Sequence, residues 1–175
     1  MSDHHEAVAQ ALSQPIDLLA AADGPAVAET GDVSAWQLPA QDKTALAHWG
    51  VPLLEECRLV PHIQQGAMPE LDVRGQKFYA LGLFANHEIG VLPSAGEVWA
   101  IPADPALPKV FINSSVTLFV ETTWRWYWTW KELDALRADI EQYDVLDAFL
   151  AFATTRDPRV GAAEPSLWPG LIQSW

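Results

Sequence analysis

A few side chains in this sequence suggest chemistry by type and spacing, and the first group is Asn113, Ser114 and Ser115. A serine hydroxyl can act as a nucleophile when a base lies beside it. Asn and Ser are also typical helix N-caps, because their side-chain oxygens accept hydrogen bonds from the free amides of a first helical turn. Capping explains all three residues without catalysis, so we expect a helix that begins near Ser114 or Ser115.

Cys57 is the single cysteine, and His62 follows five residues later, which raises the hypothesis of a reactive thiolate. The adjacent Glu55 and Glu56 oppose that hypothesis, because nearby negative charge disfavours the thiolate. We therefore expect Cys57 to act as a small buried hydrophobic residue.

Metal and cofactor motifs give little signal. His4 and His5 could suggest a metal site, but adjacent histidines at an unstructured end are typically exposed and inert. The sequence has no Gly-rich phosphate loop, nucleophile elbow, cysteine pair or His-x-x-x-His motif. We predict no cofactor and no metal.

The numerous carboxylates could supply a general acid and base if two of them met in a cleft. Their spacing selects no pair, so we predict that the protein is not an enzyme. An uncharacterised hydrolase is the alternative, and a deep pocket with paired carboxylates of raised pKa would support it.

The length and the apolar content indicate one cytoplasmic domain. A chain of 175 residues can bury a core without metal or disulfide crosslinks. No stretch approaches the roughly 18 to 20 uninterrupted apolar residues of a membrane span. The first ten residues lack the basic region of a secretory signal.

The charge balance is strongly acidic, with 23 Asp and Glu against 10 Lys and Arg, a net charge of -13. Such a chain is repelled by nucleic acid and by anionic membranes, and it attracts a basic partner. Solubility alone is the alternative explanation. The part up to Glu56 has nine acidic residues and one basic residue, Lys43, which makes it a candidate docking region.

The chain divides into residues 1–33, expected to be a loosely held N-terminal segment, and residues 34–175, expected to be a single domain. Four residues interrupt any long helix in the first part: Pro15, Gly24, Pro25 and Gly31. Short helical turns fit residues 7–12 and 16–22. In the second part, Asp42 is expected to cap a helix over residues 43–49, which Gly50 ends.

Five strands are expected, at residues 57–60, 77–82, 88–92, 97–101 and 109–112. The turn at residues 93–96 joins two of them into a hairpin. Because most of the strands are neighbours in sequence, an antiparallel meander flanked by N-terminal and C-terminal helices is predicted, an α+β fold.

Residues 124–130 place a tryptophan at every second position, which by itself indicates a strand. We favour a continuing helix, because six residues share one helical face: Val116, Phe119, Val120, Thr123, Tyr127 and Trp130. Trp124 and Trp128 then lie on the opposite flank. Either the C-terminal Leu167, Trp168, Ile172 and Trp175 cover that flank, which we favour, or the exposed rings form a contact surface.

Residues 131–152 are also expected to be helical, with a bend near 142–144. Residues 154–165 are polar and broken by Pro158, Gly161 and Pro165, and a short helix at 167–175 is expected to pack back on the domain.

A strand, a loop and a capped helix in this order carry a family resemblance. The chain resembles the SUKH superfamily (the Smi1/Knr4-like fold), and in particular its SUKH-4 type. The matching residues are Gly96, Val98, Trp99, Val110, Phe111, Asn113, Ser114, Ser115, Val116, Phe119 and Val120. Weaker matches lie at residues 36–39, 46, 50–52 and 167–169.

The resemblance implies a cytoplasmic immunity protein that binds and neutralises a toxin domain, often a nuclease or a deaminase. The alternative is a regulatory interaction module on the same fold with no toxin partner. Partner contacts vary within the superfamily, so the matching residues are structural. Candidate contacts are the acidic Glu88, Glu97 and Asp104, with Trp124 and Trp128 as aromatic anchors if they are exposed.

Overall fold

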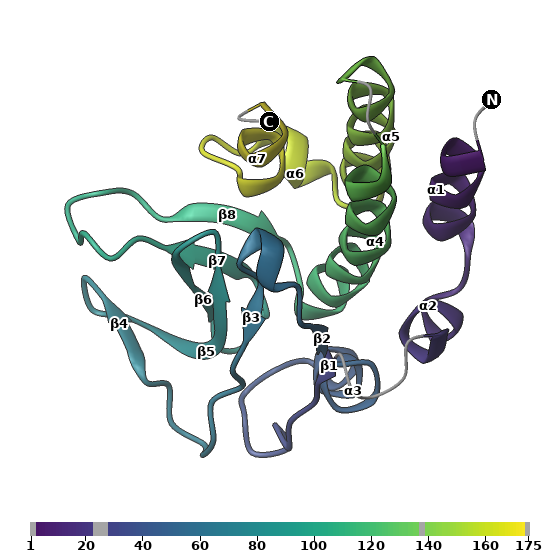
Figure 1. The fold of residues 1–175 in the computed structure, drawn as a ribbon. Helices are drawn as coiled ribbons and strands as arrows, with labels where there is room; N and C mark the ends of the chain where they lie inside the picture. Colours follow the sequence, from purple (N-terminus) through teal and green to yellow (C-terminus); the bar gives the residue numbers. More distant parts are fainter. Residues whose placement is uncertain (1–2, 23–27, 137–138, 174–175) are drawn as a thin grey trace.

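The computed structural model describes residues 3–22, 28–136 and 139–173. It is an α+β fold in which one antiparallel sheet lies against a long helix (Figure 1). The strands follow the order β3-β5-β6-β7-β8, and β4 pairs with β5 off this path. Their bounds are Val60–Pro61 (β3), Leu71–Val73 (β4), Gln76–Phe84 (β5), His87–Val91 (β6), Val98–Ile101 (β7) and Val110–Asn113 (β8). The predicted fold class and meander are confirmed.

The short strands were the hardest to predict. A two-stranded sheet, β1 (Ala28–Glu29) with β2 (Val51–Pro52), and the strand β4 were not predicted. The predicted strand at 57–60 is mostly wrong, because a 3-10 turn, η2 (Glu55–Cys57), precedes a left-handed Arg58. The predicted burial of Cys57 concerns a side chain outside the described residues.

The central helix α4 spans Val116–Ala135 and contains the alternating tryptophans, so the prediction of a helix there is confirmed. Ser115 is its N-cap, and the Ser115 side chain accepts a hydrogen bond from the Leu118 amide. Among its buried residues are Phe119 and Trp126. The helix joins the sheet to the remaining helices through one apolar core.

The helix α3 spans Ala40–His48, and its N-cap is Pro39 with no side-chain capping bond. The predicted cap at Asp42 is therefore wrong: Asp42 lies inside the first turn, is buried, and binds α4 instead. The predicted end is confirmed, since Gly50 has φ +64° and its amide donates to the Ala45 carbonyl.

The C-terminal helices are α5 (Asp139–Arg156), α6 (Pro158–Ala162) and α7 (Leu167–Gln173). The helix predicted over 131–152 is confirmed over most of its length, but α4 ends at Ala135 and Leu136 is extended, so two helices stand in place of one. The interruption comes earlier than the bend expected near 142–144, and those residues lie within α5. The short helix expected at the end is confirmed, although Trp175 lies outside the described residues.

Two helices precede the sheet, α1 (Asp3–Ser13) and α2 (Ile16–Ala22), and both pack against α4. Figure 1 shows them on the side of α4 that faces away from the sheet. Val8 and Leu19 are buried there. His4 lies on α1, and its Nδ1 is 2.8 Å from Glu132 Oε2, so the expectation that His4 is exposed and inert is wrong. That residues 1–33 are loosely held stays a prediction.

Candidate partner-binding surface

The Asn113-Ser114 motif is held by a buried carboxylate that the sequence did not single out. Asp157, which is 2 % exposed, accepts hydrogen bonds from the Ser114 amide and hydroxyl, both at 2.7 Å, and from Asn113 Nδ2 at 3.2 Å. Asn113 Oδ1 accepts the Trp168 indole N–H. These polar groups satisfy one another, so the motif fixes β8 to α6 and α7 and offers no free nucleophile.

The rest of the motif is structural too. Asp42 Oδ1 accepts the amide and the hydroxyl of Thr117, at 2.8 and 2.7 Å, which joins α3 to the first turn of α4. Gly96 has φ +73°, and a Cβ at this position would lie 2.2 Å from Asp42 Oδ2. A glycine is therefore required where the β6-β7 turn meets α3. Val98 and Phe119 are fully buried.

Trp99 lies on the outer face of the sheet, the face that points away from α4. Its ring packs edge-on against Phe111, and Lys109 Nζ lies 5.1 Å from its ring centroid. Burial of Lys109 lowers its pKa, and the nearby Glu97 opposes that shift. This corner of the outer face therefore holds a partly buried cation between aromatic rings.

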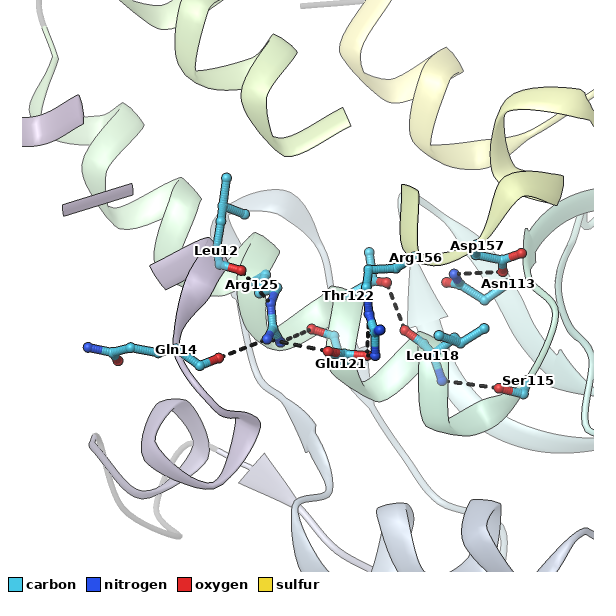
Figure 2. A network of polar contacts seen from close by, with 10 residues as sticks. All are labelled: Leu12, Gln14, Asn113, Ser115, Leu118, Glu121, Thr122, Arg125, Arg156 and Asp157. Carbon is cyan, nitrogen blue, oxygen red and sulfur yellow. Dashed lines mark hydrogen bonds and ion pairs between the residues drawn. The ribbon is translucent and has the colours of Figure 1, made fainter. Parts of the chain in front are cut away.

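A second polar network anchors the N-terminal helices to α4, and Figure 2 shows its members. The Arg125 guanidinium donates to the Gln14 carbonyl at 2.9 Å and to the Leu12 carbonyl at 3.4 Å. Glu121 lies 3.3 Å from Arg125 and 2.8 Å from Arg156. Burial lowers the pKa of Arg125, and the Glu121 carboxylate offsets part of that effect. Arg125 thus caps the last turn of α1 through main-chain atoms.

The two candidate aromatic anchors are covered, and the cover is not the predicted one. Trp124 is fully buried, and its indole N–H points at the Trp49 and Gly50 carbonyls, so it cannot serve as an exposed anchor. Trp128 is half-buried and donates to the Leu19 carbonyl of α2. The C-terminal Trp168 packs instead against Trp126, on another side of α4. The expected C-terminal cover of this flank is therefore wrong.

The three candidate acidic contacts do not form one cluster. Glu97 precedes β7, whereas Glu88 pairs with Ile101 at the other end of that strand, about 13 Å away at 3.3 Å per residue. Glu97 is bound to Arg159, with Oε1 and Nη1 2.6 Å apart. Glu88 is exposed.

Asp104 is exposed in the β7-β8 loop, and its Oδ1 accepts the Ala106 amide. The same loop receives a cation, because Arg74 donates to the carbonyls of Pro105 and Ala106. Lys109 lies at the end of this loop. Asp104 therefore lies among groups of mixed charge.

A groove between η2 and the second half of α4 was missed by sequence reasoning. Its volume is about 240 Å³. The residues that line it are Leu53, Leu54, Glu56, Tyr127, Trp130, Lys131 and Asp134. Glu56 and Asp134 are exposed and make no ion pair within the described part of the chain. The groove therefore combines an aromatic wall with two carboxylates and one cation, Lys131. The only sequence signal was the acidic pair Glu55 and Glu56.

Among the described residues, no group of three or more His, Cys, Asp or Glu side chains could hold a metal ion. None of the described helices is both long enough and apolar enough to pass through a membrane.

Comparison with known proteins gives one result. The model of the SUKH-4 immunity protein family matches residues 11–174, whereas no curated protein and no solved structure matches the chain. The match spans the sheet, the capped helix α4 and the C-terminal helices, and it begins within α1. The order of the elements and the buried motif agree with it, and the chain belongs to the SUKH-4 immunity protein family.

Proposed function

We propose that this chain acts in the cytoplasm as an immunity protein that binds a toxin domain rich in basic groups, and that it acts without catalysis. The observation that carries the proposal is the excess of exposed carboxylates. Within the described residues, eleven of them make no ion pair: Glu6, Asp32, Glu55, Glu56, Glu70, Glu88, Asp104, Asp134, Asp144, Asp147 and Glu164.

The physical mechanism is competition for a basic surface. A nuclease or a nucleic-acid deaminase must bind phosphate with Lys and Arg, and an acidic protein on that surface excludes the substrate. Opposite charges also speed the encounter, and salt screens this effect. The pockets on the described surface are small, 240 to 360 Å³ in volume. Pockets of this size are compatible with a role in protein binding.

The acidic contacts proposed from the sequence are not equivalent. Glu88 is the best candidate, because it is exposed and free of an ion pair among the described residues. Asp104 is exposed beside Arg74, and Glu97 is already bound to Arg159. We therefore expect Glu88 to contribute more to partner attraction than the other two.

The test is co-expression with the toxin domain encoded by the neighbouring gene, followed by association kinetics of the purified pair. We expect the chain to restore growth, and the association rate to fall about tenfold or more between 50 and 500 mM NaCl. Growth that is not restored, together with absence of binding at low salt, would contradict the toxin-binding role. Tight binding with a salt-independent rate would contradict the basic nature of the partner.

A further inference from the structure

An exposed apolar row crosses one face of the sheet at its β3 edge. Val60 on β3 is the register partner of Leu83 on β5, and Leu83 is the partner of Glu88 on β6. Directly opposed residues of antiparallel strands point to the same face. Val60 is 39 % and Leu83 is 41 % exposed, which is unusual for large apolar side chains beside each other on a sheet.

The apolar row continues through Leu53 into the groove beside α4. Leu54 and Leu59 form an antiparallel bridge, so their neighbours Leu53 and Val60 lie side by side. Leu53 is 36 % exposed and also lines the groove that holds Glu56, Asp134 and the aromatic rings. The short strand β2 contacts both β3 and α4, which places this edge of the sheet beside the groove. Row and groove therefore form one continuous surface, which we call the β3 face: Leu53, Glu56, Val60, Leu83, Glu88 and Asp134.

The charges on the β3 face select the chemistry of its partner. Three carboxylates, Glu56, Glu88 and Asp134, surround the apolar side chains. Two cations lie nearby: Arg58, which donates to Asn86 Oδ1 at 2.7 Å, and Lys131, whose Nζ lies 4.6 Å from the ring centroids of Tyr127 and Trp128. The three carboxylates outnumber them, so the face keeps an excess of negative charge. An apolar centre with a charged rim is the usual anatomy of a protein interface.

We propose that the β3 face is the docking site for the toxin domain, which rests on the function proposed above. The groove receives an arginine or lysine side chain, because aromatic rings and carboxylates together bind such cations. The row of Leu53, Val60 and Leu83 packs against apolar side chains of the same basic partner. A second copy of this chain is a poorer occupant, since each copy carries a net charge of -13.

The experiment measures the affinity of the neighbouring-gene toxin domain for matched variants. Val60→Lys with Leu83→Lys removes the apolar row, and Glu56→Lys with Asp134→Lys reverses the charge of the groove. Leu18→Lys with Leu107→Lys, and Asp144→Lys with Asp147→Lys, are the controls, because these side chains are exposed elsewhere and each pair undergoes the same change of charge. Circular dichroism and thermal unfolding verify that each variant is folded.

We expect each β3-face variant to lose affinity by about tenfold or more, and each control by about twofold or less. If the wild type binds the toxin domain and both β3-face variants bind it with the same affinity, the docking site is overturned and the proposed function is left intact. Failure of the wild type to bind would overturn both. If instead the chain forms a dimer, and Val60→Lys with Leu83→Lys abolishes that dimer without changing the affinity for the toxin domain, the row serves self-association. That result would also overturn the docking site.

Discussion

Asp157 connects two segments that lie 43 residues apart in sequence, through hydrogen bonds to Asn113 and Ser114. Replacing it with Ala leaves the part-buried amide and hydroxyl of Ser114 and the buried Asn113 side-chain amide without their acceptor. We expect Asp157→Ala to lower the free energy of unfolding by about 2 to 4 kcal/mol. Urea denaturation measures this loss, and the exposed Asp147→Ala is the control, with a change within about 0.5 kcal/mol. A similar midpoint for both variants would contradict the role of Asp157.

Gly96 combines a backbone requirement with a close approach to Asp42, and a second glycine separates the two effects. Gly75 also has a positive φ, of +82°, but no atom lies within 4 Å of its ideal Cβ position. We expect Gly75→Ala to cost about 1 kcal/mol through backbone strain alone, and Gly96→Ala to cost about 1 to 2 kcal/mol more. Thermal unfolding compares the two variants. Equal losses would show that the contact with Asp42 adds nothing.

At the residue scale, the sequence predicted what local chemistry determines and missed what tertiary contacts determine. Ser115 was predicted as a cap because its role depends only on the next three residues. Asp42 has the same capping chemistry, yet its partner is Thr117, 75 residues away. Asp157 gave no signal for the same reason. Long-range partners of buried carboxylates have no periodicity that a single sequence can reveal.

The attachment of α1 to α4 depends on Arg125, whose side chain is 5 % exposed, and not on Arg156, whose side chain is 52 % exposed. Both arginines contact Glu121. We expect Arg125→Met to increase amide exchange throughout residues 8–22, because the carbonyls of Leu12 and Gln14 lose their donor. Arg156→Met removes an exposed ion pair and is expected to change stability by about 1 kcal/mol or less.

Hydrogen exchange followed by mass spectrometry distinguishes the two arginine variants. Protection of residues 8–22 that stays at the wild-type level in Arg125→Met would contradict the anchoring role. Faster exchange in both variants would instead assign the anchor to Glu121, which the two arginines share.

At the element scale, long and strongly periodic segments were predicted correctly. The helix α4 was identified because its 3, 4 and 7 spacing outweighed the alternating tryptophans. Among the elements that were missed are β1, β2 and β4, which have two or three residues each and too little length for any period. The cover of Trp128 by α2 was missed because α2 is rich in Ala, and its small apolar face gives a weak signal.

The whole molecule carries a net charge of -13, so its folded state repels itself at neutral pH. We expect the midpoint of thermal unfolding at pH 7 to rise by a few degrees when NaCl increases from about 20 to 300 mM, because salt screens this repulsion. Near the isoelectric point of about 4.5 the same addition should have much less effect. Differential scanning calorimetry compares the two conditions. An equal shift at both pH values would attribute the effect to general salting out.

The contacts between α4 and its N-terminal cover have a consequence for sequence variation. Arg125 binds the carbonyls of Leu12 and Gln14, and Trp128 binds the carbonyl of Leu19. Every residue type presents the same carbonyl, so these contacts do not depend on which side chains α1 and α2 carry. The exposed positions of the two helices can therefore diverge freely while the anchors on α4 are retained. A library randomised at those positions, with Arg125 and Trp128 unchanged, should yield mostly folded proteins.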